Sequence, residues 1–467
     1  MTSLELTPPR HKLKTGVKLA YGVGDLGPAI VTTINGFFLN AFLIEVAGLR
    51  PALAGLVFLI VKIWDSVNDP IVGALTDRTN TRWGRRRPWL LFGAVPFALA
   101  YLMQWLVPDW GPAGKFWYYL IVAILLDAGF TAVNVPYAAL TPELSPDYDE
   151  RTSLNAYRFS FSILGGTFAA FFHAVILTAH PGEAILRGYF ISAAIWAAVI
   201  VISNVITFAF TRESQFTGTA SESPSFMEGL RIAFSNRAFL YVTTIYLLSW
   251  LAIQFVQNNL ILYVKYWAGA ENQFQWLLLA IQLGIFFFLM VWTKISRRIG
   301  KQRVYYLGAS FWIAVSIALF FVPAGQIPLL FVLGPLASVG VSVCYLVPWS
   351  LLPDVVEFDE LQTGQRREGI YYGFFVFLQK LGMSLGMAAS NLILDAAGYV
   401  KPAFAGAALA PAQPDAVLTA LRTFVSLVPA GILMVSFIFV YKYPITRARF
   451  SEIQTELTRR REQNDAS

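Results

Sequence analysis

The sequence predicts an all-α membrane protein in which twelve transmembrane helices form two six-helix bundles. Of its 467 residues, 56% are hydrophobic and 13% are charged, and the mean hydropathy is +0.57. A soluble domain carries about 25% charged residues, so the composition excludes that class. Apolar stretches of about 20 residues, long enough to cross a bilayer, recur along the chain. Twelve are found, and they begin near residues 17, 53, 89, 116, 156, 188, 239, 274, 304, 328, 371 and 417.

The second half of the chain repeats features of the first. The fourth stretch ends in NVPYAALTPEL and the tenth in LVPWSLLPDV, while the loop TDRTNTRWGRRR is echoed by TKISRRIGKQR. Both pairs are separated by close to half the chain length. Such a repeat indicates two six-span halves in the same orientation, which is the plan of the major facilitator fold. We therefore expect a bundle over residues 1–211, a cytoplasmic linker over 212–236, a second bundle over 237–442 and a cytoplasmic tail over 443–467.

The placement of the positive charges predicts the orientation in the membrane. The net charge of +7 comes from basic residues that gather before the first span, after the second and after the eighth. By the positive-inside rule, these loops and both termini are cytoplasmic, in a multi-pass protein of the plasma (inner) membrane. This distribution explains the charge without a nucleic-acid partner. The residues are Arg10, Lys12, Lys14 and Lys18; Arg78, Arg82, Arg85, Arg86 and Arg87; and Lys294, Arg297, Arg298, Lys301 and Arg303.

The loop after the second span matches the major facilitator signature, with Asp77 and Arg78 followed by Gly84 and Arg85. Asp77 falls at the carboxyl end of a predicted helix, where the helix dipole disfavours a negative charge. We expect Arg78 or Arg85 to compensate it, in a charge clamp that takes part in gating. The alternative is that the arginines only set the topology.

Two carboxylates, Asp65 and Asp69, lie deep inside the second predicted span. Asp65 is about 18 Å from the outer end, close to the bilayer midplane, where a charge costs roughly 2.5 to 3.5 kcal/mol on insertion scales. The two acids are four residues apart and share a helix face with Asn68. Oxygen ligands in this arrangement suit a hard cation. A structural ion pair with Lys62 is the alternative, but one lysine cannot neutralise two carboxylates.

Three segments resemble the glycoside-pentoside-hexuronide:cation symporter family (melibiose permease-like). They are IWDSVNDPIVG followed by RWGRRRP, then TPELSPDYDERTSLNAYRF, and LPDVVEFDELQTGQRREGIYYGFFVFLQKLG. The resemblance implies that Asp65, Asn68, Asp69 and Thr131 surround a coupling sodium ion, with Asp65 and Asp69 as its charged ligands. A proton is the alternative coupling ion. A proton would need one carboxylate only, whereas Asn68 and Thr131 are useful mainly to a coordinated metal ion, so sodium is favoured.

The predicted substrate residues depart from the melibiose permease pattern, whose sugar-binding positions correspond to Ala29, Asn134 and Ala138. Asp25 and Asp127 share helix faces with these positions and are expected to line the cavity, although Asp25 could instead pair with Lys18. Lys380 lies about 14 Å inside the eleventh span and needs an anion, either in a fixed salt bridge or as a movable partner of Asp65 or Asp69. The predicted substrate-binding set is Asp25, Asp127, Asn134, Arg158, Tyr345, Trp349 and Lys380. Arg158 has a second interpretation, a pair with acids of the preceding loop.

Together these features predict a secondary active transporter that couples inward sodium movement to a sugar or glycoside by alternating access. Proton coupling, and a lysolipid or another organic solute as cargo, are alternatives with the same fold. A membrane enzyme is less well supported, since only three histidines occur and no HExxH motif is present. We expect no cofactor beyond the coupling ion, and a monomer in the lipid bilayer.

Overall fold

The computed structural model describes residues 12–145, 147–213, 226–365, 367–403 and 411–465, and within these ranges it is helical with no strand. The first half contains α1 (Thr15–Val23), α2 (Leu26–Ile34), α3 (Pro51–Arg78), α4 (Arg87–Gln104), α5 (Pro112–Leu144), α6 (Tyr148–Thr178) and α7 (Ile185–Phe210). The second half contains α8 (Phe226–Ser235), α9 (Arg237–Tyr263), α10 (Phe274–Ile299), α11 (Lys301–Phe320), α12 (Ile327–Thr363), α13 (Glu368–Ala396), α14 (Asp415–Val425), α15 (Leu427–Lys442) and α16 (Arg447–Asp465).

Short turns of other helix types connect or extend these elements. Three are single π-helical turns: η1 (Asn35–Leu39), η2 (Phe42–Val46) and η4 (Val264–Ala268). Two are 3₁₀ turns: η3 (Gly182–Ala184) and η5 (Glu271–Gln273). The π turns extend α2 and α9 at the far ends of the first and seventh predicted spans.

The helices agree with the predicted spans. Within the described ranges, nine helical segments are long and apolar enough to cross a membrane. They correspond to the second, fourth to tenth and twelfth predicted spans. The first predicted span is broken into α1, α2, η1 and η2, and the third and eleventh coincide with α4 and α13. The all-α fold class is therefore confirmed.

The described residues fall into two compact units. Unit 1 comprises residues 1–35 and 63–219, and unit 2 comprises residues 36–62 and 220–467. Residues 36–62 thus pack with the second half of the chain, and α3 passes from unit 2 into unit 1 after Lys62. The predicted domain bounds stay a prediction. Most of the predicted linker, residues 214–225, lies outside the described residues, as does Arg10.

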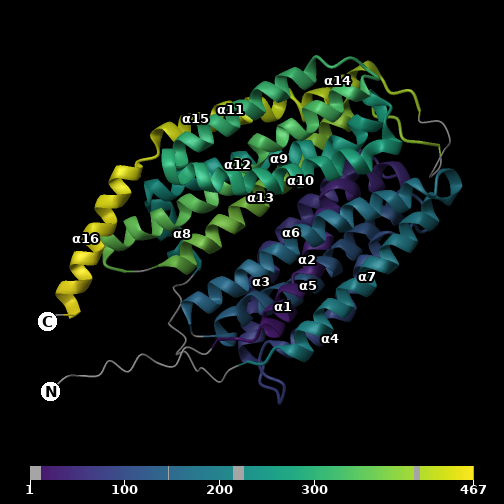
Figure 1. Cartoon of the computed structure of the whole chain (residues 1–467). Helices are drawn as coiled ribbons and strands as arrows, with labels where there is room; N and C mark the ends of the chain where they lie inside the picture. The colour runs from purple at the N-terminus through teal and green to yellow at the C-terminus, as the bar shows by residue number, and fades with distance from the viewer. Residues whose placement is uncertain (1–11, 146, 214–225, 366, 404–410, 466–467) are drawn as a thin grey trace. The chain divides into compact units, whose positions relative to one another are not determined.

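Unit 1 is built around α4, which packs along α5 and α7, and around α6, which packs against α1, α2 and α7 (Figure 1). The buried end of α4 carries an aromatic cluster in which Trp105 stacks on Tyr189 with ring centroids 5.4 Å apart. His173 lies against the same cluster, and its Nδ1 is 2.7 Å from the hydroxyl of Ser192. This histidine therefore has a structural place in the core.

Unit 2 is built around α9, which packs against α12, α13, α14 and α15, with α11 alongside α12 (Figure 1). The contact between α11 and α12 is very close at Gly340. A methyl group on Gly340 would lie 2.3 Å from the carbonyl oxygen of Gly308 and 2.4 Å from Cβ of Trp312. Glycine is needed at this crossing because no side chain fits between the two backbones.

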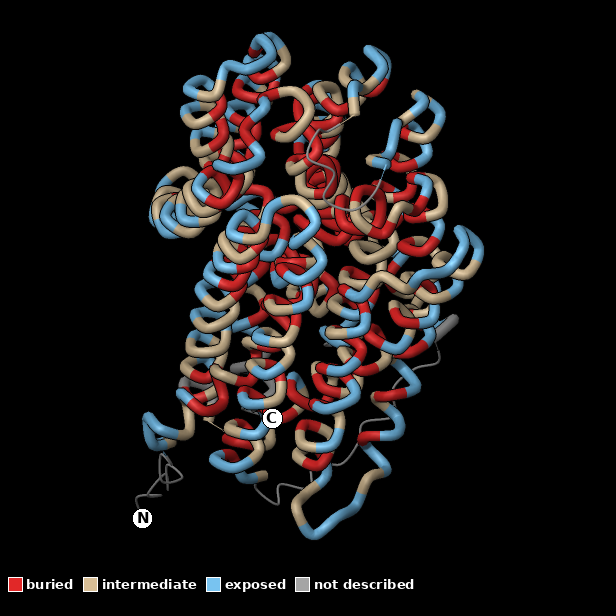
Figure 2. Tube along the Cα trace, turned by 90° about the vertical axis from the view of Figure 1, so that its right-hand side faces the viewer, coloured by how far each residue is buried: buried red, intermediate tan, exposed pale blue. Residues whose placement is uncertain are grey.

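Exposed residues occur along the helices as well as at their ends (Figure 2). Many of them are large and apolar. Phe92 is 61% exposed, Ile202 57%, Phe210 65% and Ile438 52%. Monomeric soluble proteins rarely expose large areas of apolar surface. Exposed apolar faces combined with internal hydrogen bonding of the helix backbone match a protein whose solvent is lipid.

Candidate cation and substrate site

Helix α3 presents the three predicted oxygen ligands on one face. Asp65 is 1% exposed and Asn68 5% exposed, while Asp69 is half-buried. Their spacing of three and four residues places them within about one turn of the helix. The part of α3 that carries them belongs to unit 1.

Helix α5 brings the fourth predicted ligand to this face. Thr131 is 1% exposed, and its hydroxyl donates a hydrogen bond of 3.0 Å to Oδ1 of Asp69. The sequence cannot place these residues together by spacing, since they are 62 positions apart. The structure thus joins the predicted cation residues of two helices in unit 1.

The side-chain amide of Asn68 is buried, and its nitrogen has no hydrogen-bond partner within the described ranges. Buried polar atoms in native proteins nearly always have partners, so a lone one calls for an explanation. The nitrogen and oxygen of an amide exchange positions by a half-turn of the group. An Asn68 amide turned in this way would present its oxygen where the nitrogen now lies.

No group of three or more His, Cys, Asp or Glu side chains that could hold a metal lies in the portion of the chain that the structure describes. The predicted site does not depend on such a group. It has two carboxylates, completed by an amide and a hydroxyl. The roles of Asp65, Asn68, Asp69 and Thr131 as ligands therefore remain predictions, with the bond between Thr131 and Asp69 as the observed contact.

The predicted substrate residues of unit 1 include a buried ion pair. Nε of Arg158 lies 3.2 Å from Oδ1 of Asp25, whose side chain is 7% exposed. The guanidinium also lies 5.0 Å from the ring centroid of Tyr137, which stacks on Tyr21. Tyr137 in turn donates a hydrogen bond of 2.7 Å to the backbone carbonyl of Tyr21. These contacts hold the charged pair against an aromatic wall.

This pairing decides between the interpretations that the sequence left open. Lys18 pairs with Glu150, with its Nζ 2.9 Å from Oε2 of that residue. The ion-pair partner that the structure gives to Asp25 is Arg158. Asp25 lies in the two-residue turn between α1 and α2.

The substrate residues predicted on α5 share one helix face with the cation ligand Thr131. Asp127 is 9% exposed and Asn134 is half-buried, while Ala138 is exposed. The positions 127, 131, 134 and 138 follow the spacing of a single helical stripe. The predicted substrate and cation positions of α5 are thus adjacent along one face.

The predicted substrate residues of unit 2 lie on α12 and α13. Tyr345 meets Trp250 edge-on with ring centroids 5.0 Å apart, and Trp349 meets Phe375 at 5.5 Å. Trp349 is 40% exposed, so part of its ring can contact a solute. Lys380 is half-buried on α13. Its pairing with Asp65 or Asp69 stays a prediction.

In the signature loop the directly bonded partner of Asp77 is Arg86, while the expected cation Arg85 is near enough for the charge of Asp77 to contribute to raising its pKa. Asp77 contacts the guanidinium of Arg86, which is 8% exposed and also donates a 2.6 Å hydrogen bond to the hydroxyl of Thr76. Arg85 instead bonds Glu143 at 2.6 Å, and this hydrogen bond raises the pKa of Arg85 above its usual value. Arg78 is exposed. The gating role of Asp77, Arg78 and Arg85 remains a prediction.

Glu213 organises this loop, a role that its sequence context does not reveal. Its carboxylate accepts backbone N–H bonds from Arg85 at 2.6 Å, Arg86 at 2.7 Å and Arg87 at 2.8 Å. An anion at these positions satisfies the first donors of α4 and interacts favourably with its dipole. The loop turns at Gly84 with φ +106°, where a side chain would be strained and would meet Glu213. Nothing in the local sequence pairs position 213 with position 84.

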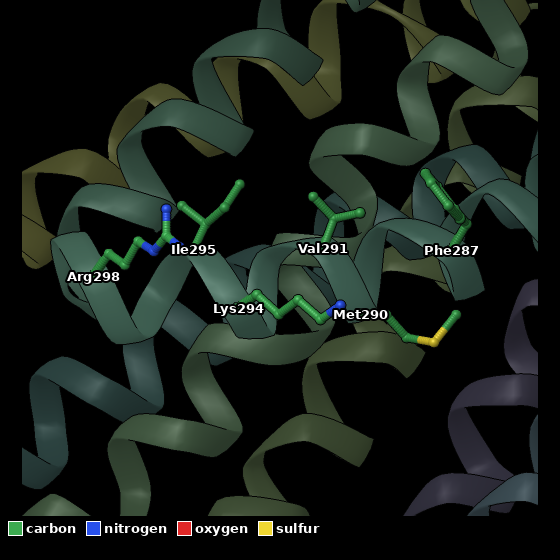
Figure 3. A pocket seen from close by; sticks show the side chains of 6 residues that line it. All are labelled: Phe287, Met290, Val291, Lys294, Ile295 and Arg298. Carbon is green, nitrogen blue, oxygen red and sulfur yellow. The ribbon is translucent and has the colours of Figure 1, made fainter.

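Two of the cavities lined by described residues lie in unit 2, and neither is lined by the predicted cation residues. The larger, about 440 Å³, lies along the exposed face of α10 (Figure 3). Its lining runs from Phe287 at one end to the cations Lys294 and Arg298 at the other, with Met290, Val291 and Ile295 between. The smaller, about 70 Å³, is mainly apolar and is lined in part by Tyr345, Gln257 and Gln282.

Comparison with known proteins shows the family to which the chain belongs. The family described as "MFS/sugar transport protein" matches residues 20–447. The chain belongs to this family. An uncharacterised symporter of Synechocystis is 39% identical, with 97% of this chain and 98% of the relative covered. The sodium-dependent lysophosphatidylcholine symporter 1 of Gallus gallus is 29% identical, with 98% and 92% covered.

Solved structures support the fold of this MFS/sugar transport family member. A bacterial homologue of the human lysosomal transporter Spinster superposes with a TM-score of 0.68 at 13% identity, covering 94% of this chain and 97% of that one. A D-xylose–proton symporter gives 0.62 at 15% identity, covering 92% and 98%. The protein is therefore a multi-pass secondary transporter of the major facilitator superfamily, of the symporter type, and not an enzyme.

Proposed function

We propose that this transporter is a sodium-coupled symporter of the plasma membrane, with both termini in the cytoplasm, that moves an organic solute inward by alternating access. The observation that carries the proposal is the buried oxygen cluster of α3 and α5. It combines Asp65, Asn68 and Asp69 with the hydroxyl of Thr131, which is bonded to Asp69 at 3.0 Å. Intramembrane carboxylates of this kind are costly and mark ion paths.

Sodium is favoured over a proton by the neutral members of the cluster. A proton site is complete with one titratable carboxylate, whereas a sodium ion needs several oxygens around it. The buried amide of Asn68, with one terminal position unpartnered within the described ranges, and the buried hydroxyl of Thr131 supply neutral oxygens. Lys380 is the predicted ion-pair partner of Asp65 or Asp69. In this proposal the ion pair breaks when sodium binds to the carboxylates.

A sugar or glycoside is the first candidate cargo. The ion pair between Asp25 and Arg158 can exchange hydrogen bonds with hydroxyl groups, and the exposed part of Trp349 can stack on the apolar face of a sugar ring. The changed positions Ala29, Asn134 and Ala138 argue against a melibiose-like galactoside in particular.

A lysophospholipid is the second candidate cargo. Two observations favour it: the apolar, cation-ended cavity along α10 in unit 2, and the names of relatives that are sodium-dependent lysophosphatidylcholine symporters. Such a cargo would use the same cation site but would need an apolar surface for its acyl chain.

The proposal is tested with purified protein in liposomes and in detergent. A thermal-shift screen of sugars, glycosides and lysophospholipids, each with sodium or potassium, identifies the cargo because a ligand at 100 times its Kd adds about 2.7 kcal/mol to the native state. Uptake of the cargo found is then measured with a sodium gradient.

Asp69→Asn is expected to abolish sodium-stimulated uptake, because it removes one of two charges from the cluster. The matched control is Asp109→Asn, the same change at an exposed loop position, which should transport like the wild type. Sodium-dependent uptake that survives in Asp69→Asn would refute the site. A proton gradient that drives wild-type uptake equally well without sodium would refute the ion.

A further inference from the structure

Glu45 is a buried carboxylate that the proposed transport site does not use. Its Oε2 lies 2.5 Å from Nζ of Lys265, and the two side chains are only 7% and 17% exposed. The hydroxyl of Tyr266 donates to Oε1 at 2.6 Å, and the hydroxyl of Tyr399 donates to the same oxygen. We call these four residues, all in unit 2, the Glu45 cluster.

The cluster joins turns of the same unusual type from the two sequence halves. Glu45 lies in the π turn η2, and Lys265 and Tyr266 lie in the π turn η4. The two turns lie at the far ends of the first and seventh predicted spans, close to half the chain length apart, so they occupy matching places in the predicted repeat. Single π turns are rare in proteins, and those that occur are often found at functional sites. Tyr399 follows α13 and adds a third element.

Further polar contacts hold residues 36–62 to the rest of unit 2 on either side of the cluster. Toward the loop, Arg50 forms an exposed ion pair with Asp395 at 2.8 Å, and Lys401 donates to the carbonyl of Gly48 at 3.1 Å. Deeper in the helices, the amide of Asn391 donates to Asn40 at 2.8 Å.

A buried ion pair adds little net stability, since apolar residues of similar size hold two elements together at least as well. A buried ion pair does, however, impose a large free-energy cost when only one of its partners is removed. Removing one partner leaves the other charge buried without compensation, which is strongly unfavourable. Segments joined in this way are either fully engaged or apart, as a two-state gate requires.

We infer that the Glu45 cluster is a latch that fastens residues 36–62 to the rest of unit 2 at the far ends of the first and seventh predicted spans, and that it opens once per transport cycle. When the latch is closed, residues 36–62 are fastened to η4 and to the end of α13. When it opens, Glu45 and Lys265 separate into water and the face of α9 beneath them becomes accessible. The inference rests on the proposed alternating-access function but concerns residues outside its cation and cargo sites.

The chain offers a reporter for this opening. Gln257 on α9 is half-buried and lies against Gly36, since a methyl group at Gly36 would lie 2.9 Å from the Gln257 amide. The one native cysteine, Cys344, is buried. In a Cys344→Ala background, Gln257→Cys gives a single thiol whose reaction with a membrane-impermeant maleimide measures how often residues 36–62 lift away.

Glu45→Gln and Lys265→Gln should each raise the labelling rate about tenfold or more, because each strands a buried charge whose loss of partner costs well above the 1.4 kcal/mol of a tenfold change. The double variant Glu45→Gln/Lys265→Gln should fall back toward the wild-type rate, since a neutral pair has no stranded charge. Tyr399→Phe, which keeps both charges, should raise the rate about threefold.

The matched control is Glu271→Gln. Glu271 lies 3.7 Å from the same Lys265 but is exposed, so its removal should change the rate less than twofold. Labelling rates that stay at the wild-type value in both single variants would overturn the latch, as would equal effects of Glu45→Gln and Glu271→Gln. If Glu45→Gln does not yield folded protein, Lys265→Gln and Tyr399→Phe decide the question in the same way.

Labelling is measured without sodium or solute, so its outcome is independent of the proposed transport. If the protein transports nothing with sodium but shows the expected labelling pattern, the latch is supported and the proposed ion or cargo is refuted. If the protein transports with sodium but the variants show no change in labelling rate, the proposed function is supported and the latch is refuted.

Discussion

Replacing Thr131 by valine tests the cation cluster with the smallest change in shape. The hydroxyl is buried and donates a 3.0 Å hydrogen bond to Asp69, so valine removes one neutral oxygen and one bond to a charged group while filling nearly the same volume. A hydrogen bond to a charged group contributes about 1.5–3 kcal/mol. If half of that is lost from sodium binding, the sodium concentration for half-saturation rises about threefold to twelvefold, at 1.4 kcal/mol per tenfold.

Thr131→Ser is the matched control because it keeps the hydroxyl and removes only the methyl group. Its half-saturating sodium concentration should stay within about twofold of the wild type, apart from the small cost of a missing methyl. The assay is a sodium titration of the thermal unfolding midpoint in detergent, with choline chloride keeping the ionic strength constant. If valine and serine shift the half-saturating concentration equally, Thr131 is a packing residue and not a sodium ligand.

Two further predictions concern the framework around the sites. Glu213→Ala should lower the free energy of unfolding by about 2 kcal/mol, because three backbone donors at the start of α4 lose their carboxylate, and the unfolding midpoint should fall by about 2–4 °C. The exposed Glu183→Ala is its control, and equal midpoints for the two would contradict the capping role. Gly340→Ala should cost about 3 kcal/mol, since its methyl group would meet the Gly308 carbonyl at 2.3 Å. Gly431→Ala, where nothing lies within 4 Å, should be neutral or slightly stabilising in the same melting experiment.

The spans were predictable because hydropathy is a local property of the chain. A run of about 20 apolar residues can satisfy its backbone in a membrane only as a helix, whatever its neighbours are. The face shared by Asp65, Asn68 and Asp69 was predictable for a similar reason, since helix periodicity determines which side chains lie together. The interruption of the first span by η1 and η2 was not predicted.

The partners of the charged residues were less predictable. The sequence favours Arg78 or Arg85 as the partner of Asp77, but the loop turns at Gly84 so that Arg86 contacts Asp77 and Arg85 contacts Glu143. A change of one residue in such a turn exchanges one arginine for another. Nothing in the sequence marks Glu45 as paired, because it lies near the end of an apolar stretch and its partner Lys265 is 220 positions away.

By itself, the sequence determined the membrane class, the helical spans, the repeat and the helix face that carries the two acids. These features depend on composition and on periodicities within one helix. The tertiary structure alone decided which helices meet. It joined Thr131 to Asp69, Arg158 to Asp25, Glu213 to the start of α4 and Lys265 to Glu45. A charged side chain inside a membrane protein is usually paired or functional, and packing between distant segments decides which partner it contacts.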